Sequence, residues 1–319
     1  MPQNDRQRPR RLEEPPNGLS GLNAQQQNFL DVGMKPATNR LSDATKSFDF
    51  TARDFARVRE LIYRKAGISL SESKREMVYS RLARRLRARN LNSFSHYLDM
   101  LERGDDVDEW QAFTNALTTN LTAFFREAHH FPVLAEHIRK ATPPLSIWCA
   151  AASTGEEPYT IAMTVCEAFG SLTPPVSIVA TDIDTNVLET AASGVYPMER
   201  VDKMARDRLK RFFLRGKGER TGYVRVRPEL RQLVTFRQLN LLAPAWPVRG
   251  PFDAIFCRNV MIYFDKPTQA MILDRFVPLM KPDALLFAGH SENFMYASNA
   301  FRLRGKTVYE LVTGAKDKP

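Results

Sequence analysis

The pattern of apolar and polar positions divides the chain into a helical segment and a longer segment in which strands and helices alternate. Between residue 48 and about residue 115, apolar residues recur every three or four positions, which is the spacing of amphipathic helices. Gly67 separates the first two of these helices. The buried stripes that this spacing predicts are Phe55, Val58, Leu61 and Ile62, and then Val78, Leu82 and Leu86.

From residue 145 onward, short apolar runs alternate with helical segments, which is typical of a parallel α/β sheet. Between residues 200 and 236 the rhythm changes, because apolar and polar residues alternate around several glycines. We interpret this region as a small antiparallel β insert at about 209–236, whose last strand continues into the main sheet. The main-sheet strands are predicted to begin at 145 and to cover 176–181, 252–257 and 284–288, before a closing hairpin at 301–311.

These patterns predict three parts of the chain. Residues 1–47 are rich in Pro, Gln, Asn and Arg and poor in core-forming residues, so we expect a disordered tail. Residues 48–115 form a helical N-terminal domain, and residues 116–319 form the α/β domain with its insert. The stretch 115–127 between them has polar residues on one side and apolar residues on the other, and its simplest interpretation is an amphipathic connecting helix.

The loop after the first predicted strand is the part of the chain that points to a ligand. Residues 150–155 are almost all small, so a ligand could approach their backbone closely, and Asp182 stands at the carboxyl end of the second strand, where an acid can bind ribose hydroxyls. The loop has one glycine, Gly155, and is followed by Glu156 and Glu157, which would repel a pyrophosphate. A cationic adenosine ligand without phosphate, such as S-adenosylmethionine, fits better, although an ordinary loop without ligand remains an alternative.

The carboxyl ends of parallel strands meet at one crevice, so residues that follow different strands should share this site. A methyl acceptor that is an amine needs a loop that holds it and its proton, whereas a carboxylate, with a reference pKa of about 4.3, is already ionised. The loop at 259–263 lacks the prolines of amino-methyltransferases, and Arg126, Arg258 and Tyr263 could hold a carboxylate. The residues expected at the crevice are Glu156, Asp182, Asn240, Arg258, Asn259 and Tyr263.

Charge adds a second candidate surface. The chain carries a net charge of +10, and residues 51–100 contain 12 Lys or Arg against 5 Asp or Glu. Such a run is either a solvated face or a docking face for an acidic partner. Aromatic residues do not interleave with these arginines, which argues against single-stranded nucleic acid. The side chains that cluster beside the second helix's apolar stripe are Lys74, Arg81, Arg84 and Arg85, with Arg87 beyond them.

The positions of the cysteines and histidines indicate the cellular compartment and argue against a metal site. Cys149, Cys166 and Cys257 lie in apolar segments without a C-x-x-C pair, which favours buried thiols in a reducing cytosol. The five histidines lack zinc-site spacing, and no signal peptide or membrane-spanning apolar run is evident. We therefore expect a monomeric cytoplasmic protein without a metal.

Four motifs together resemble the chemotaxis receptor methyltransferases, the CheR family. They are TNLTAFFRE at 119–127, ASTGEEPY at 152–159, ATDID at 180–184 and CRNVMIYF at 257–264, and the resemblance extends over about residues 48–312. It implies methyl transfer from S-adenosylmethionine to receptor glutamates, with Arg126 and Tyr263 nearest the methyl group. The implied cofactor contacts are Asn120, Thr122, Arg126, Glu156, Asp182, Asn240, Leu241, Arg258 and Asn259.

The resemblance also implies partners. The helix that bears Arg81, Arg84, Arg85 and Arg87 looks like the face that docks on acidic methylation helices of a receptor, and the insert resembles a β-subdomain that binds a receptor's C-terminal peptide in some members. The membrane would then be met only through the receptor. Two other functions remain: an RNA methyltransferase, which the basic helix would suit, and a non-catalytic receptor-binding adaptor. Missing stacking aromatics argue against the first, and intact Arg126, Asp182 and Tyr263 argue against the second.

Overall fold

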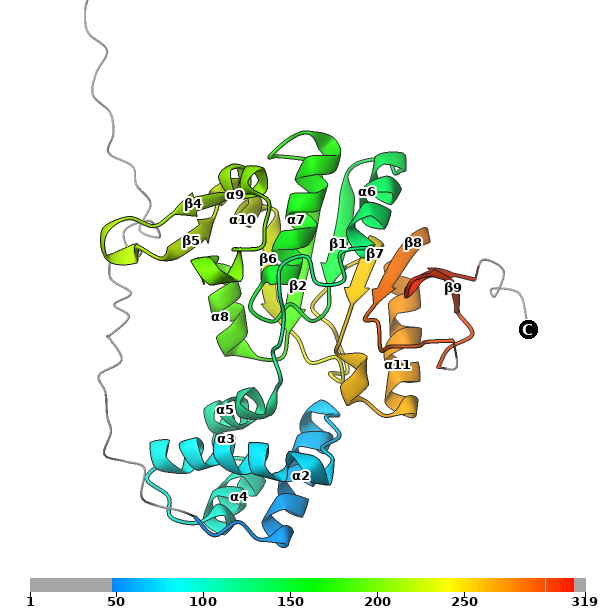
Figure 1. The fold of residues 1–319 in the computed structure, drawn as a ribbon. Helices are drawn as coiled ribbons and strands as arrows, with labels where there is room; N and C mark the ends of the chain where they lie inside the picture. Colours follow the sequence, from blue (N-terminus) through cyan, green and yellow to red (C-terminus); the bar gives the residue numbers. More distant parts are fainter. Residues whose placement is uncertain (1–47, 296, 313–319) are drawn as a thin grey trace, which may run out of the picture. The chain divides into compact units, whose positions relative to one another are not determined.

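The computed structural model describes residues 48–295 and 297–312. The tail predicted at 1–47 lies outside these residues. In the described part, the chain forms helices first and then a mixed α/β layer structure, as Figure 1 shows by its colour sequence from blue to red.

In the described residues, four α-helices make up the N-terminal domain, and their ends follow the expected signals. Thr51 and Asp54 form a capping box at the first helix, and Gly67 ends it in the left-handed conformation with φ 68°. The apolar stripes predicted from the sequence meet in one core, with Val58, Leu82 and Leu86 fully buried. The helices are α2 (Ala52–Ala66), α3 (Arg75–Ala88), α4 (Phe94–Arg103) and α5 (Val107–Leu117), and a 3₁₀ turn, η1 (Glu72–Lys74), precedes α3.

The described part of the α/β domain contains a seven-stranded sheet with the order β6-β2-β1-β7-β8-β10-β9. Strands β6, β2, β1, β7 and β8 pair in parallel, and β10 pairs antiparallel with both β8 and β9. The order reverses between β1 and β7, which is the switch point where ligands bind in open α/β sheets. The strands are β1 (Leu145–Cys149), β2 (Val176–Asp182), β6 (Val234–Gln238), β7 (Phe252–Cys257), β8 (Met280–Ala288), β9 (Phe301–Gly305) and β10 (Val308–Leu311).

Helices cover both faces of this sheet (Figure 1), which explains why the central strand β7 is buried along its whole length. On one face, α6 (His130–Lys140) and α7 (Glu156–Phe169) pack on Ile147 and Phe256. On the other face, α11 (Lys266–Phe276) packs on Trp148 and Ile255. Outside the insert, the α/β domain also contains α8 (Thr185–Ser193), the 3₁₀ turn η4 (Met261–Tyr263) and the 3₁₀ turn η5 (Val277–Leu279).

The predicted insert is present, but its boundaries differ. Its antiparallel sheet has the order β3-β5-β4 and begins before residue 209, because the short strand β3 (Val195–Pro197) follows directly on α8. Residues 234–236 of the predicted insert are part of β6 in the main sheet. The insert also contains β4 (Phe213–Arg215), β5 (Tyr223–Val226), α9 (Arg206–Phe212), α10 (Pro228–Gln232) and the 3₁₀ turns η2 (Met198–Arg200) and η3 (Gly218–Arg220).

The prediction of a connecting helix at 115–127 is wrong. Helix α5 ends at Leu117, and the chain beyond it has left-handed backbone at Phe125, φ 55°, and Glu127, φ 52°. The two neighbouring phenylalanines, Phe124 and Phe125, pack against different parts of the insert. Phe124 packs edge-on against Phe213 of the insert, with ring centroids 5.6 Å apart, whereas Phe125 lies under the Arg208 guanidinium at 4.4 Å. An irregular segment therefore spans the mouth of the crevice, anchored on the insert.

Candidate functional site

A cavity of about 210 Å³ lies at the carboxyl ends of the parallel strands, and the helical domain supplies part of its wall. Residues from the loops after β1, β2, β6 and β7 line it, as the strand-end rule predicts. The helical domain contributes Ile68, Leu70 and Met77, which the sequence did not single out because their role depends on how the two domains meet. It also contributes Lys74, which the sequence analysis had placed in the basic cluster. Of the predicted site residues, the lining contains Asn120, Thr122, Arg126, Asp182, Asn240, Leu241, Arg258, Asn259 and Tyr263.

Asp182 organises the loop after β1. Its Oδ2 accepts the backbone N–H of Ser153 at 2.8 Å, and its Oδ1 accepts that of Asp184 at 3.0 Å. Burial raises the pKa of Asp182 to about 6, although these N–H groups favour its ionised form. Gly155 allows the loop to turn at φ 98° beside α8, where a Cβ would lie only 2.9 Å from the Ala191 Cα. The carboxylate is thus held at the cavity wall with lone pairs available for a ligand.

The two adjacent glutamates face different environments. Glu156 is fully buried, forms an ion pair with Arg200 and accepts a hydrogen bond from Thr154 Oγ1, and it does not line the cavity. Glu157 lines the cavity instead, and burial raises its pKa. The structure therefore brings Glu157 to the site where the motif comparison had named Glu156. Both residues lie in the first turn of α7, and the sequence carried no signal for which one faces inward.

Arg258 is the buried cation of the site. Its Nη1 donates to Glu157 Oε2 at 2.7 Å, and its Nη2 donates to the Arg126 carbonyl at 2.6 Å. The Glu127 carboxylate lies 3.3 Å from the same Nη2. The guanidinium thereby links β7, α7 and the 118–127 segment. Since Arg258 is only 4% exposed, it is paired on the protein side and presents little surface to a ligand.

The 118–127 segment reaches the cavity through hydrogen bonds to the β2 end. Asn120 Nδ2 donates to Asp184 Oδ2 at 2.8 Å, and Ser153 Oγ donates to the Asn120 carbonyl at 3.0 Å. Arg126 Nη1 donates to the Leu121 carbonyl at 2.8 Å. The exposed Leu121 stands at the cavity mouth. This segment is therefore placed to contact a ligand with both backbone and side chains.

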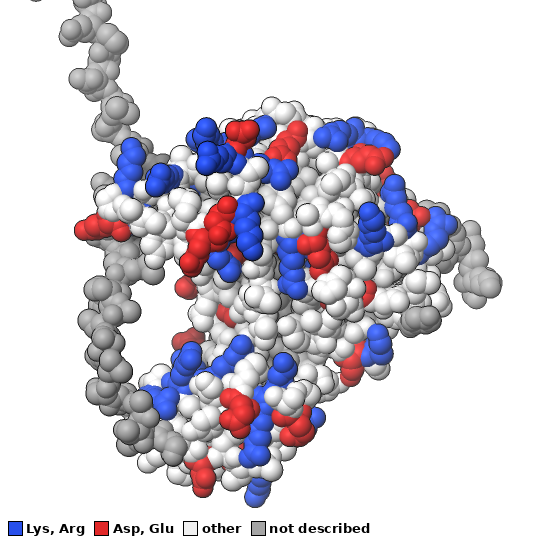
Figure 2. All heavy atoms as spheres, in the orientation of Figure 1, with Lys and Arg blue, Asp and Glu red and all other residues white. Residues whose placement is uncertain are grey.

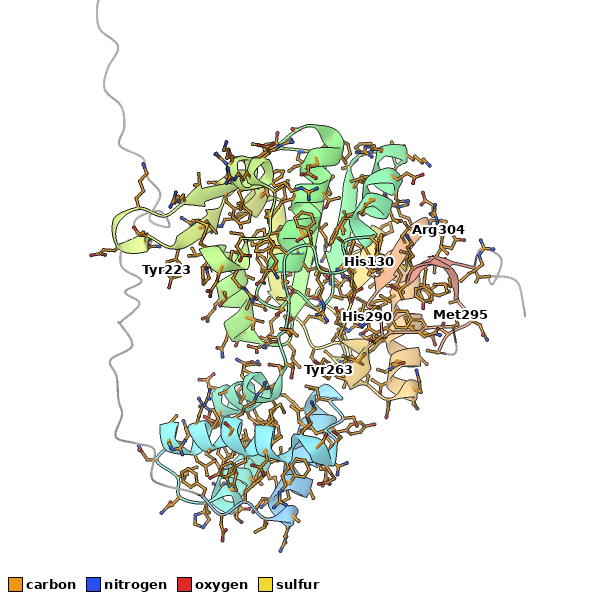
Figure 3. All side chains as sticks on the ribbon, viewed as in Figure 1. His130, Tyr223, Tyr263, His290, Met295 and Arg304 are labelled. Carbon is orange, nitrogen blue, oxygen red and sulfur yellow. The ribbon has the colours of Figure 1, made fainter. Side chains whose placement is uncertain are left out.

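Tyr263 and Asn240 close the site on the side of the helical domain. The Tyr263 carbonyl accepts the Ser69 N–H at 3.0 Å, and Asn240 Nδ2 donates to the Lys65 carbonyl at 2.7 Å. Figure 3 shows Tyr263 at the lower end of the α/β domain, beside the helical domain. The helical domain is thus attached directly to two segments that line the cavity.

The arginines predicted to form one docking face have different partners. Arg81 Nη1 donates to the carbonyls of Ala116 at 3.2 Å and Thr118 at 2.5 Å, and so it fixes the end of α5. Arg85 pairs with the buried Glu109 at 2.6 Å. A groove of about 670 Å³ beside α3 and α5 is lined by Arg81, Arg84 and Arg85, and Figure 2 shows basic side chains over this part of the helical domain.

The remaining member, Arg87, does not line this groove. Its guanidinium lies 5.4 Å from the Phe48 ring centroid. Arg84 is exposed to solvent at the groove. Because Arg81 and Arg85 already serve internal contacts, Arg84 is the arginine of this set most available to a partner.

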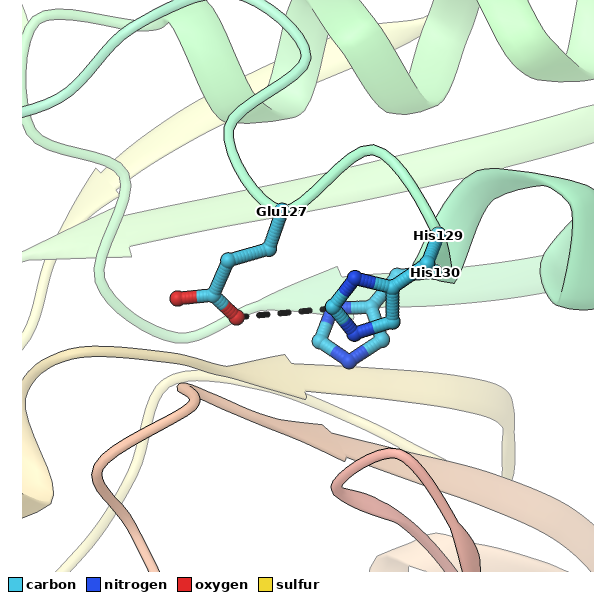
Figure 4. Close-up of side chains that lie close together, drawn as sticks. All are labelled: Glu127, His129 and His130. Atoms are coloured by element: carbon cyan, nitrogen blue, oxygen red, sulfur yellow. Dashed lines mark ion pairs between the residues drawn. The ribbon is translucent and has the colours of Figure 1, made fainter.

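Glu127, His129 and His130 bring possible metal-ligand atoms within 4.8 Å of one another (Figure 4). Burial lowers the pKa of His130 to about 4, so the ring is neutral at pH 7. Burial alone would raise the pKa of Glu127, but hydrogen bonds from His290 and the charge of Arg258 lower it to about 2. With the Arg258 guanidinium 3.3 Å from Glu127, a cation between these residues would be repelled, and we assign no metal here.

The fold and the cavity define a class. A doubly wound sheet with an acid at the end of its second strand is suited to binding a ribose, and the loop after its first strand lacks the glycines that bind a pyrophosphate, which together fit an S-adenosylmethionine-dependent methyltransferase. Residues 120–310 match the family model described as CheR methyltransferase, SAM binding domain, and residues 53–118 match CheR methyltransferase, all-alpha domain. The chain belongs to the CheR methyltransferase family.

Curated relatives agree with this assignment. The chain is 59% identical over 267 residues to chemotaxis protein methyltransferase 2 of Pseudomonas aeruginosa PAO1, covering 83% of this chain and 95% of that protein. It is 56% identical over 274 residues to the chemotaxis protein methyltransferase of Escherichia coli K12, covering 86% and 96% respectively. The predicted family, fold class and cofactor, S-adenosylmethionine, are confirmed. In the described residues, no helix is long and apolar enough to cross a bilayer.

Proposed function

We propose that this methyltransferase converts glutamate side chains of chemotaxis receptors into methyl esters. The observation that carries the proposal is the lining of one cavity by Arg126 and Tyr263 together with a 259–263 loop that has no prolines. These groups suit an acceptor that is negatively charged and needs no general base. A glutamate carboxylate meets both conditions at pH 7.

Within this proposal, each cavity residue has a role. Asp182 accepts hydrogen bonds from ribose hydroxyls, and Glu157, which takes the place of Glu156, faces the cationic part of the cofactor. The remainder of the cofactor is contacted by Asn120, Thr122, Asn240, Leu241 and Asn259. Arg258 contributes indirectly, through the residues that it fixes in place. S-adenosylmethionine supplies an activated methyl group, which leaves as a cation equivalent while the electron pair of its carbon–sulfur bond stays on sulfur.

The chain's own contribution is to position the acceptor and exclude water. Arg126 and Tyr263 would hold and orient the glutamate oxygen in the cavity, where the bound cofactor would supply the methyl group. Orientation of this kind is the largest effect available when neither reactant needs activation, and a misplacement of about 1 Å can cost about 10²-fold in rate.

Two surfaces fit the proposed receptor. Acidic methylation helices would dock at the groove that contains Arg84, where opposite charges favour encounter. A receptor peptide could pair with an edge strand of the insert, β3 or β4, beside the half-buried Arg225 on the central strand β5. In this proposal the enzyme is a cytoplasmic monomer that meets the membrane only through its receptor.

The test is the chemical nature of the transferred methyl group. Purified protein is incubated with methyl-labelled S-adenosylmethionine and receptor-containing membranes, and the labelled product is then treated with mild base. A glutamate methyl ester releases its label as methanol, whereas N-methyl groups on protein or RNA retain it. Base-stable label, or label in nucleic acid, would contradict the proposal. An Asp182→Ala variant controls for cofactor-independent label.

A further inference from the structure

The loop that follows β7 carries three of the proposed site residues, Arg258, Asn259 and Tyr263, and most of its backbone bonds are made by side chains outside the cavity. Its backbone N–H groups converge on a single buried carboxylate, that of Glu292, which is 4% exposed. Glu292 Oε2 accepts the Asn259 N–H at 2.9 Å, and Oε1 accepts the N–H groups of Val260 at 2.9 Å and Met261 at 2.8 Å. One side chain therefore satisfies three consecutive donors of the loop.

The carbonyl groups of the same loop converge on a second buried side chain. Gln269 of α11 is 9% exposed, and its Nε2 donates to the carbonyls of Met261 at 2.9 Å and Phe264 at 3.0 Å. Glu292 thus accepts hydrogen bonds from N–H groups of the loop, and Gln269 donates hydrogen bonds to its carbonyl groups. Because buried backbone groups are costly to leave unpaired, these two residues over-determine the loop conformation.

The conformation that they hold is an unusual one. Asn259 has φ 58°, a left-handed backbone that residues other than glycine seldom adopt and that asparagine tolerates better than most. The neighbouring chain is packed so closely that a Cβ on Gly289 would lie 2.9 Å from the Asn259 nitrogen and 2.8 Å from Glu292 Oε2. The Gly289 N–H also donates to Glu292 Oε2, at 2.5 Å. Left-handed backbone at a functional site persists only where its surroundings enforce it.

We propose that Glu292 and Gln269 are positioning residues for methyl transfer, which act by fixing Asn259 and Tyr263 at the cavity. Neither side chain lines the cavity, so neither touches cofactor or acceptor directly. Their effect passes through the backbone between β7 and α11. The inference rests on the proposed roles of Asn259 and Tyr263 and adds two residues to them.

The predicted effect differs from general destabilisation, and β7 itself offers the control. Asp253, at the opposite end of this strand, is 3% exposed, accepts the Ser146 N–H at 2.8 Å and pairs with Lys281 at 2.7 Å. It is as buried as Glu292 and also bonds backbone, but it lies outside the cavity lining. Asp253→Asn should lower thermal stability without moving the loop.

The experiment compares Glu292→Gln, Gln269→Leu and Asp253→Asn in the full chain. Glu292→Gln turns an NH₂ group toward two N–H donors, so the loop must shift. We expect its affinity for S-adenosylmethionine, measured by calorimetry, to fall at least about tenfold, and its single-turnover rate at saturating cofactor to fall further, toward about 10²-fold. Gln269→Leu should show the same pattern to a smaller degree, with the single-turnover rate falling more than the cofactor affinity. Asp253→Asn should match the wild type in both quantities.

Wild-type affinity and rate in Glu292→Gln would overturn the inference. So would losses of affinity and rate in Asp253→Asn as large as those in Glu292→Gln, if the two variants have the same melting temperature. If Glu292→Gln does not fold, Gln269→Leu decides by the same criteria. An Asp182→Ala variant, altered on a different segment of the cavity, separates this inference from the proposed function. Normal cofactor affinity in Asp182→Ala would contradict the proposed site, whereas a loss there with none in Glu292→Gln and Gln269→Leu would contradict only the positioning role.

Discussion

Arg258 and Glu157 form a buried ion pair at the centre of the site, with Nη1 and Oε2 2.7 Å apart and exposures of 4% and 8%. The pair joins the end of β7 to the first turn of α7, the two elements that flank the topological switch point. Glu157 Oε1 also accepts a hydrogen bond from Cys149 Sγ at 3.3 Å, so three neighbouring segments depend on one carboxylate.

The first prediction concerns this pair. Arg258→Met should lower the free energy of unfolding by about 3–5 kcal/mol, because it leaves the Glu157 charge buried and unpaired. Adding Glu157→Gln should recover part of this loss, because the remaining partner is then neutral. Urea unfolding of the two single variants and the double variant measures the coupling. The exposed pair Arg59–Glu72 is the control, and Arg59→Met should change stability by about 0–1 kcal/mol. Strictly additive effects of Arg258→Met and Glu157→Gln would contradict the pairing.

The second prediction concerns cofactor binding and pH. Burial raises the pKa of Asp182 to about 6, so this carboxyl is increasingly protonated below pH 6 and loses acceptor capacity for ribose hydroxyls. Affinity for S-adenosylmethionine should therefore be constant above about pH 7 and fall by up to about tenfold per pH unit below pH 6. Calorimetry between pH 5 and 8 gives the profile. Asp182→Asn should bind more weakly throughout and show a flatter profile. An identical pH profile in that variant would remove Asp182 from the ligand contacts.

The third prediction concerns stability in acid. Burial lowers the pKa of His130 from its usual 6.5 to about 4, and its Nε2 lies 3.0 Å from the Lys306 carbonyl. Between pH 6.5 and 4 the unfolded chain binds a proton that the folded chain excludes, so the contribution of His130 to stability is lost as pH falls through this window, by about 3 kcal/mol in total.

His130→Gln keeps a donor for the Lys306 carbonyl and cannot titrate. The difference in unfolding free energy between wild type and this variant should shrink as pH falls from 7 to 4.5, measured by urea unfolding at each pH. Comparing the two proteins removes the contribution of Asp182, whose raised pKa acts in the opposite direction. A difference independent of pH would show that His130 does not titrate as a buried neutral ring.

The fourth prediction separates docking from folding on α3. Arg84→Glu should reduce receptor methylation and its sensitivity to salt while leaving cofactor affinity unchanged, because Arg84 is exposed at the groove. Arg81→Glu should reduce both, because it breaks the bonds to the Ala116 and Thr118 carbonyls that precede the cavity segment. Arg139→Glu on α6 makes the same charge change on an exposed position of the α/β domain. Equal losses of methylation in Arg84→Glu and Arg139→Glu would argue against a docking face at α3.

The sequence predicted the framework of the site well, for a physical reason. Strand ends and helix caps are local features, so Asp182 at the end of β2 and Gly67 after α2 could be located from residue type and spacing alone. The strand-end rule then brought Asp182, Arg258 and Asn259 to one crevice without any knowledge of the sheet order.

What sequence reasoning missed depends on contacts between distant segments. The choice between Glu156 and Glu157 rests on Arg200 and Arg258, which lie far from them in sequence. Helical spacing placed Arg81 beside the apolar stripe but could not show that it bonds the carbonyls at the end of α5. The 115–127 segment was predicted to be helical because its polar and apolar residues fall on opposite sides of a helix. In the structure, its two phenylalanines instead pack against different parts of the fold, and the backbone is irregular.

The most direct test of the central claim is to identify the residue that becomes methylated. Receptor membranes are incubated with the wild-type enzyme and S-adenosylmethionine, digested at mildly acidic pH to preserve esters, and mapped by mass spectrometry. The account predicts methyl groups on glutamate side chains in acidic helical segments of the receptor, and none after incubation with Asp182→Ala. Methyl groups on lysine, arginine or histidine instead, or an unmodified receptor with the wild-type enzyme, would contradict it.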